Sequence, residues 1–346
     1  MGLEMVEKMQ AVVCKNPHDM AVDELPKPVP APGEVLLRIV RAGICGTDYH
    51  IYSGLHPFLE YPRVIGHELA GVVVNAPKKT GWRAGQLAVV NPYLACGICH
   101  ACRAGLLNCC MKISVLGVHQ DGGMAEYLSI PVANLLPAET LTPDQAGSVE
   151  FLAIGAHAVR RGSVHAGQRV LVIGAGPIGI GAAIFARIAG GQVTIVDRDP
   201  DRLALVADVT GITDTILADA HLPQAVAEAT GGDGFDVVFE ATGNSTSMEA
   251  SFAHVAHGGS LVFVGLIKAS ISFSDPEFHR REMQVLASRN ATLVDFQKVM
   301  SSMLKGEVDV SRLITHRTTL ARVATDLPYW AQHKAGLIKA MVDFAP

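Results

Sequence analysis

The stretch RVLVIGAGPIGIGAAIFARIAGGQVTIVD, residues 169–197, decides the fold. It begins with an uninterrupted apolar run, which is typical of a parallel strand buried on both faces. A glycine-rich turn follows, and then come the helical stretch IGAAIFARIAG (180–190) and a second apolar strand, QVTIVD (192–197). This order predicts a βαβ unit within a parallel, doubly wound sheet, and therefore an α/β protein.

The turn of this unit carries a G-x-G-x-x-G pattern formed by Gly174, Gly176, Pro177, Ile178 and Gly179. The pattern alone is weak evidence, but here it joins a buried strand to a helix, which is the context that dinucleotide binding requires. The first glycine permits the tight turn, and the second lets a pyrophosphate approach the backbone at the helix N-terminus. The third allows close packing of helix on strand. We therefore predict a dinucleotide site, in preference to a packing turn without a ligand.

An acidic residue at the end of the second strand indicates which dinucleotide binds. Asp197 lies 23 residues after Gly174. A carboxylate at this place accepts hydrogen bonds from the adenosine ribose and repels the extra phosphate of NADP. Arg198 follows directly and could instead pair with that phosphate. The carboxylate favours NAD.

Three parts of the chain differ in their residue patterns. Residues 1–150 contain short β-branched runs, such as EVLLRIVRAGI (34–44), separated by glycine- and proline-rich turns. They predict a mainly β domain. Residues 151–288 alternate strand-like and helical stretches, and residues 289–346 return to mixed character. We predict a catalytic domain whose first part is 1–150 and whose second part is 289–346, with a nucleotide domain at 151–288 between them.

Composition narrows the class of protein. The chain is 49% hydrophobic and 18% charged, with a formal net charge of −5. Because phosphate binding needs a basic face, this balance argues against a nucleic-acid partner. Apolar runs stay short of transmembrane length, and the N-terminal MGLEMVEKMQ lacks the apolar core of a signal peptide. We expect a cytoplasmic protein without a membrane partner.

Four of the seven cysteines are clustered. Cys96, Cys99, Cys102 and Cys110 form a C-x2-C-x2-C-x7-C pattern. In a reducing compartment such a cluster indicates metal ligands rather than disulfides. Four thiolates close a tetrahedral shell around zinc and leave no open position, so we predict a structural zinc site. Cys109 stands beside Cys110 and leaves the fourth ligand ambiguous.

A second set of metal-binding residue types is spread along the first 150 residues. It comprises Cys45, His67, Glu68 and Glu150. Thiolate, imidazole and carboxylate are the ligand types of an open, catalytic zinc. Each residue alone is weak evidence, since a single histidine is more often a packing or surface residue. The prediction rests on their occurrence together with a dinucleotide fold and a four-cysteine cluster.

The chain resembles a known family over essentially its whole length. The segments GICGTDYH (43–50), GHE (66–68) and VIGAGPIG (172–179), together with the four-cysteine cluster, are similar to the zinc-containing medium-chain dehydrogenase/reductase family. Within it, GVHQDGG (117–123) and SRNAT (288–292) most resemble the L-galactonate 5-dehydrogenase group of the polyol, threonine and sugar-acid branch.

The resemblance implies a GroES-like catalytic domain built from both chain ends, with a Rossmann nucleotide domain inserted. It also implies Cys45, His67 and a carboxylate as ligands of the catalytic zinc. Glu150 stands where the alcohol dehydrogenase branch has another cysteine, and Glu68 is the second candidate; water could replace either. Phe151 departs from the proline that follows this glutamate in many relatives.

The same resemblance implies NAD-linked oxidation of an alcohol. Zinc lowers the pKa of a hydroxyl group that it contacts. The family pattern places Thr47 near the reacting oxygen and makes His50 the group that passes the proton to solvent, with Glu68 as a further catalytic candidate. A histidine suits this task because its ordinary pKa is near 6.5. The alternatives are a turn-capping hydroxyl for Thr47 and a plain surface histidine for His50.

The expected substrate is a small polyhydroxylated molecule with a secondary hydroxyl, with a sugar acid such as L-galactonate as the leading candidate. Arg289, in SRNAT, could bind the cofactor or hold a carboxylate through two hydrogen bonds. The alternative substrates are a polyol, a diol or threonine. A different class is a non-catalytic scaffold that keeps the fold but has lost the metal-binding residues. The resemblance implies a homodimer or homotetramer.

Overall fold

The computed structural model describes residues 7–57 and 59–345. The chain folds into two compact units. One unit is Met1–Glu150 with Met300–Pro346, and the other is Phe151–Val299. In this division residues 289–299, which the sequence analysis assigned to the second part of the catalytic domain, cluster with the nucleotide unit.

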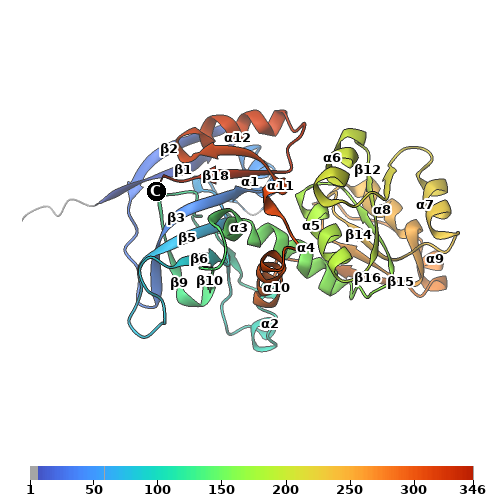
Figure 1. Ribbon diagram of the computed structural model, residues 1–346, viewed down its shortest axis with the longest axis horizontal. Helices are drawn as coiled ribbons and strands as arrows, with labels where there is room; N and C mark the ends of the chain where they lie inside the picture. The colour runs from blue at the N-terminus through green and yellow to red at the C-terminus, as the bar shows by residue number, and fades with distance from the viewer. Residues whose placement is uncertain (1–6, 58, 346) are drawn as a thin grey trace, which may run out of the picture. The chain divides into compact units, whose positions relative to one another are not determined.

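The second unit is built on a six-stranded parallel sheet with the order β13-β12-β11-β14-β15-β16 (Figure 1). The strand order reverses direction between β11 and β14, which is the arrangement of a doubly wound dinucleotide-binding fold. This confirms the predicted α/β class. The strands are β11 (Arg169–Ile173), β12 (Gln192–Asp197), β13 (Thr215–Leu217), β14 (Phe235–Glu240), β15 (Val255–Phe263) and β16 (Gln284–Ala287).

Helices connect these parallel strands, as crossover connections require. The connecting helices are α5 (Pro177–Ile188), α6 (Pro200–Thr210), α7 (Leu222–Thr230), α8 (Ser245–Ala250) and α9 (Asp275–Arg280). Helix α4 (Val149–Arg161) precedes β11, and α10 (Leu293–Leu304) follows β16. The sheet is apolar on both faces, so most residues of its central strands are buried; Leu171, Val238 and Leu261 have no exposed surface. Within the described residues, the helices all fall short of the length and apolarity needed to cross a membrane.

The first unit is mainly β, as predicted. Its largest sheet has the order β10-β6-β5-β3-β18-β17, and β9 also pairs with β3. The strands are β3 (Glu34–Ile44), β5 (Glu68–Asn75), β6 (Leu87–Val90), β9 (Tyr127–Pro131), β10 (Leu135–Pro137), β17 (Ile314–Thr319) and β18 (Lys339–Asp343). Strand β18 runs antiparallel to β3, so the two ends of the chain meet in one sheet (Figure 1, red beside blue).

Shorter elements complete the first unit. The strands β1 (Lys8–Asn16), β2 (Asp19–Pro26) and β4 (Arg63–Val64) form a three-stranded sheet, and β7 (Tyr93–Leu94) pairs with β8 (Ser114–Val115). The helices are α1 (Gly46–Tyr52), α2 (His100–Arg103), α3 (Pro143–Gly147), α11 (Val310–Leu313) and α12 (Val323–Gln332).

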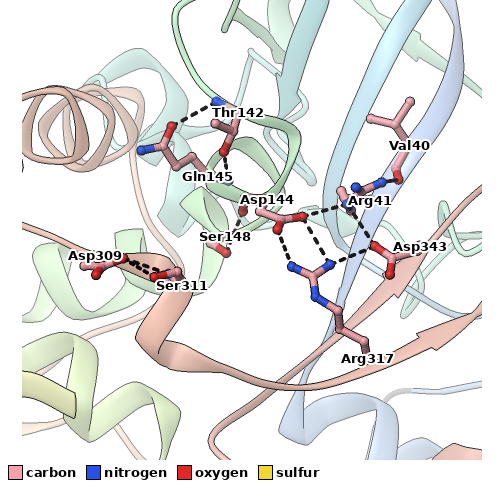
Figure 2. Close-up of polar contacts among 10 residues, drawn as sticks. All are labelled: Val40, Arg41, Thr142, Asp144, Gln145, Ser148, Asp309, Ser311, Arg317 and Asp343. Atoms are coloured by element: carbon pink, nitrogen blue, oxygen red, sulfur yellow. Dashed lines mark hydrogen bonds and ion pairs between the residues drawn. The ribbon is translucent and has the colours of Figure 1, made fainter. Parts of the chain in front are cut away.

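An ion-pair network ties the C-terminal strands and α3 to β3 (Figure 2). Arg41 of β3 lies 2.7 Å from Asp144 of α3 and 3.0 Å from Asp343 of β18. Arg317 of β17 bridges the same two carboxylates, lying 2.9 Å from Asp343 and also pairing with Asp144. Each charge in the network therefore has two opposite partners. The network fixes the position of α3, which ends at Gly147, shortly before Glu150 in the chain.

Candidate functional site

Three residues from the predicted catalytic set come together in the first unit. Cys45 is the N-cap residue of α1, His67 directly precedes β5, and Glu68 is the first residue of that strand. One ligand atom from each lies within 4.8 Å of the others. His67 and Glu68 are buried and Cys45 is half-buried. A thiolate, an imidazole and a carboxylate at this spacing form a donor set suited to zinc.

Glu68 of β5 reaches across the neighbouring strand β3 toward β18. It pairs with Gly43 of β3, where a Cβ atom would lie only 2.0 Å from Glu68 Oε2, so a glycine is required. Beyond β3, Lys339 Nζ of β18 lies 2.7 Å and 2.8 Å from the two carboxylate oxygens of Glu68 and 3.2 Å from the carbonyl oxygen of Ile44. These three acceptors account for the three hydrogens of the ammonium group. The ion pair offsets one negative charge in a cluster rich in carboxylates.

Asp48 supports the same cluster from α1. Its Oδ2 accepts a hydrogen bond from the Cys45 amide at 2.8 Å. Its Oδ1 and the Nδ1 of His67 are buried and have no hydrogen-bond partner among the residues that the structure describes. Burial raises the pKa of Asp48, although the nearby His67 opposes that shift. Orphaned polar atoms beside three clustered ligand atoms fit a site that is completed by an ion.

Glu150, the second carboxylate candidate, is held separately. It lies in the first turn of α4, is buried, and accepts a hydrogen bond from the hydroxyl of Tyr93. Burial raises the pKa of Glu150 to about 7, with an opposing contribution from His67. Burial and the adjacent carboxylate also raise the pKa of Tyr93 well above its ordinary value. Glu150 is outside the group of ligand atoms that lie within 4.8 Å of one another.

Thr47 and His50 lie on α1, the short helix that Cys45 begins. Thr47 is half-buried and His50 is exposed. Partial desolvation of the ring, together with the positive charge of Lys334, lowers the pKa of His50. Both residues therefore lie on the same short helix whose N-cap residue is the candidate metal ligand Cys45. Their roles in proton transfer stay predictions.

The four clustered cysteines form a compact group around α2. Cys99 Sγ lies 3.4 Å from Cys102 Sγ and 4.0 Å from Cys110 Sγ, and all four sulfur atoms fall within 4.8 Å of one another. Backbone hydrogen bonds, first from Met111 and then from Cys102, lower the pKa of Cys99 to about 6, which favours the thiolate that binds metal. Cys109 is exposed and outside the group.

The glycine-rich turn has the shape that a dinucleotide needs. Gly174 has a φ of +102°, and a Cβ atom on Gly179 would lie 1.8 Å from the Gly174 carbonyl oxygen. Both positions therefore require glycine. Gly176 is the N-cap residue of α5, and a Cβ atom placed there would meet open space. An anion can approach the backbone at this helix N-terminus.

Asp197 ties the end of β12 to the same turn. Its Oδ2 accepts a hydrogen bond from the Ala175 amide at 2.7 Å, and its Oδ1 accepts one from the Asp199 amide at 3.0 Å. Arg198 is exposed beside it. Arg289 is also exposed and follows β16 in the second unit.

The segment that carries Arg289 is anchored by a buried aspartate. Asp295 accepts hydrogen bonds from His157 Nδ1 at 2.9 Å, from Arg160 Nε at 2.7 Å, and from both the amide and the hydroxyl of Thr292. These contacts join the second half of α4 to the start of α10.

The comparisons with known proteins agree with this geometry. The alcohol dehydrogenase GroES-like domain matches residues 31–144, and the zinc-binding dehydrogenase domain matches residues 177–305. The chain belongs to the zinc-binding alcohol dehydrogenase family. It is accordingly an enzyme, and the predicted GroES-like and Rossmann architecture is confirmed.

Two curated relatives cover nearly the whole chain. L-galactonate-5-dehydrogenase of Escherichia coli is 42% identical, over 97% of this chain and 99% of that protein. L-threonine 3-dehydrogenase of Saccharopolyspora erythraea is 32% identical, over 91% of this chain and 93% of that protein.

Two solved structures have the same fold and differ in their cofactor. An alcohol dehydrogenase from Escherichia coli complexed with NADH matches with a TM-score of 0.91 and 28% identity, over 97% of this chain and 99% of that chain. A zinc-binding dehydrogenase from Sinorhizobium meliloti bound to NADP matches with a TM-score of 0.89 and 29% identity, over 97% of this chain and 99% of that chain.

Three residues of the site were missed by the sequence analysis. Asp48 had a usable signal, because it stands three residues after Cys45, at the N3 position where an acidic side chain completes a capping box. Lys339 had another, because a charged residue inside the apolar strand IKAMVDF needs a buried partner. Tyr93 had none, since nothing in its local sequence marks it as a partner of a carboxylate.

Proposed function

We propose that this enzyme oxidises a secondary hydroxyl of a sugar acid with NAD as the hydride acceptor, and that L-galactonate is the leading substrate. The assignment of the reaction class rests on the cluster of Cys45, His67 and Glu68 in a chain that also has the glycine-rich turn of a dinucleotide site. The sugar-acid assignment rests on the 42% identity to L-galactonate-5-dehydrogenase, which extends over nearly all of both proteins.

In this proposal Cys45, His67 and Glu68 hold a catalytic zinc, with Glu150 as the second carboxylate of the centre. Such a zinc supplies Lewis acidity, which lowers the pKa of the substrate hydroxyl by several units. The four-cysteine group of Cys96, Cys99, Cys102 and Cys110 holds a second zinc in a closed shell, which is the form of a structural site. Each chain would then hold two zinc ions with different roles.

The residues of α1 handle the proton. The Thr47 hydroxyl can both accept and donate a hydrogen bond, so it can relay a proton without changing its own charge. His50 has a lowered pKa, so it is a neutral base at pH 7, and its exposure lets it release the proton to solvent.

The nucleotide unit positions the cofactor. The turn from Gly174 to Gly179 would hold the pyrophosphate, with Gly176, Pro177 and Ile178 at the start of α5. Asp197 would accept the hydrogen bonds of the adenosine ribose, and its negative charge would disfavour NADP. We assign NAD on this ground, with Arg198 as the residue that could oppose the preference.

Arg289 is the proposed contact to the acid group or to the cofactor. A guanidinium binds a carboxylate through two parallel hydrogen bonds, which an uncharged polyol cannot use. The alternative function, oxidation of a polyol, diol or threonine, is supported by the 32% identity to L-threonine 3-dehydrogenase. A homodimer or homotetramer is the expected assembly.

A substrate panel separates these functions. Initial rates of NADH formation would be measured with L-galactonate, a second aldonate, sorbitol and L-threonine, for the parent enzyme and for Arg289→Ala. The highest kcat/KM is expected for an aldonate, and the variant should lose aldonate turnover at least tenfold more than sorbitol turnover. A far higher kcat/KM for sorbitol or threonine than for any aldonate would replace the sugar-acid assignment with the alternative.

A further inference from the structure

The contact between Tyr93 and Glu150 is buried on both sides. Tyr93 is 7% exposed and Glu150 is 4% exposed, and the tyrosine hydroxyl donates to Oε1 of the carboxylate. An ionised carboxylate only accepts hydrogen bonds, and in a buried place it needs a donor for stability. The two carboxylates of the centre are therefore held differently, because Lys339 contacts both oxygens of Glu68 whereas Tyr93 contacts one oxygen of Glu150.

The backbone of Tyr93 is fixed by two asparagines. Its amide donates to Asn91 Oδ1 at 3.1 Å, and its carbonyl oxygen accepts a hydrogen bond from Asn134 Nδ2 at 3.1 Å. The same Nδ2 also donates to the Asn91 carbonyl oxygen at 2.9 Å. These bonds hold the backbone of Tyr93 from both sides, and the hydroxyl at the end of its side chain donates to Glu150.

Tyr93 also lies at the base of the four-cysteine lobe, residues 96–110. Strands β7 and β8 pair on either side of this lobe, with Tyr93 opposite Val115. Cys96 follows Tyr93 by only three residues. A short, paired strand therefore joins the lobe to the residue whose side chain contacts Glu150.

We propose that Tyr93 is a positioning residue for the catalytic metal centre. Its hydroxyl, held at the base of the four-cysteine lobe, fixes one oxygen of Glu150 and leaves the other oxygen for the metal or a water molecule. This inference rests on the proposed function, because it requires a metal ion at Cys45 and His67. Groups that hold a ligand from behind in this way set its orientation, and their loss typically weakens metal affinity or activity by about 10- to 100-fold.

The test uses Tyr93→Phe, which removes the hydroxyl and keeps the ring. The matched control is Thr318→Val, which removes a buried hydroxyl from a different carboxylate of the same unit, since Thr318 Oγ1 lies 2.5 Å from Asp326 Oδ2. Zinc content after dialysis against a chelator and the absorption spectrum of the cobalt-substituted protein would be measured for both variants. The Tyr93→Phe protein should keep the metal of the lobe, lose the second metal at roughly tenfold lower chelator concentration, and show altered cobalt bands.

The outcomes separate this inference from the function on which it rests. If Cys45→Ser loses the second metal but Tyr93→Phe behaves as the Thr318→Val control does, the positioning role is wrong and the proposed function stands. If Cys45→Ser leaves the metal content unchanged, the proposed metal centre itself is wrong. Should Tyr93→Phe fold poorly, Glu150→Gln replaces it, because the amide keeps an acceptor for the Tyr93 hydroxyl; unchanged cobalt bands and metal retention in Glu150→Gln would also overturn the inference.

Discussion

Lys339 and Glu68 are 271 residues apart in the sequence, yet the Nζ atom of Lys339 lies 2.7 Å from one carboxylate oxygen of Glu68 and 2.8 Å from the other. Both side chains are almost completely buried. Burial alone would lower the pKa of Lys339, but the Glu68 carboxylate, together with Cys45 and Glu150, outweighs this effect and raises it. Each charge thus makes the burial of the other tolerable, and the pair links β18 to β5 across the intervening strand β3.

Removing the ammonium should be costly for stability. Lys339→Met leaves the Glu68 carboxylate buried without its counter-charge, so we expect the free energy of unfolding to fall by about 3–5 kcal/mol. Urea unfolding at pH 7 measures this loss of unfolding free energy. The control is Lys8→Met, which breaks the exposed pair with Glu24 and should cost at most about 1 kcal/mol. Equal stability of the two variants would show that the buried ion pair contributes nothing.

The Asp295 anchor predicts a pH dependence of stability. Burial raises the pKa of Asp295, but the hydrogen bonds from His157 and Arg160 outweigh it and hold the pKa well below the ordinary value. A lowered folded-state pKa stabilises the protein above the unfolded-state pKa, near 4, and this contribution is lost as the pH falls through the folded-state value. Asp295→Asn should therefore cost about 2–3 kcal/mol at pH 7.

That difference should stay constant from pH 7 to about pH 5 and shrink below about pH 4, where the unfolded carboxyl group binds a proton. Urea unfolding of the parent and Asp295→Asn across this range is the measurement. A difference that grew on acidification would mean that the sign of the linkage is wrong.

The four-cysteine lobe offers a matched pair of variants. Cys102 is buried within the sulfur group, whereas Cys109 is exposed and outside it. Cys102→Ser should release the lobe metal and lower the thermal midpoint, because a structural zinc contributes its binding free energy to folding. Cys109→Ser should keep both the metal and the midpoint. If the two variants had equal thermal midpoints, the lobe would not be a structural metal site.

Asp197 should set the cofactor preference. Asp197→Ser removes the charge that disfavours the NADP phosphate and leaves Arg198 beside it, so the ratio of kcat/KM for NADP to that for NAD should rise at least about tenfold. Steady-state kinetics with both cofactors measure this ratio. A parent enzyme that used NADP as well as NAD would show that Arg198 outweighs the carboxylate.

The nucleotide half of the fold could be predicted because its signals are local. The apolar runs that became β11 and β12, and the glycines between them, each act on the backbone of their own βαβ unit. For the candidate metal centre, the sequence predicted the types of ligand residue but not the residues that hold these ligands in place. Lys339 reaches Glu68 only because β18 pairs with β3. The apolar strand around Lys339 indicates that the lysine needs a buried partner, but the local sequence does not identify Glu68 as that partner.

The relation of Tyr93 to Glu150 was hidden for the same reason, since 57 residues separate them. The choice between Glu68 and Glu150 likewise depends on distances, and the structure places only Glu68 in the compact group with Cys45 and His67.

The zinc content of the parent enzyme and of Cys45→Ser, measured on folded protein that binds NADH, tests the central claim most directly. A chain with one closed and one open metal site should hold two zinc ions in the parent and one in Cys45→Ser, and the variant should bind NADH normally but lose turnover. A parent that held one zinc ion, retained in Cys45→Ser and lost in Cys102→Ser, would contradict the account, because catalysis would then proceed without a metal at Cys45 and His67.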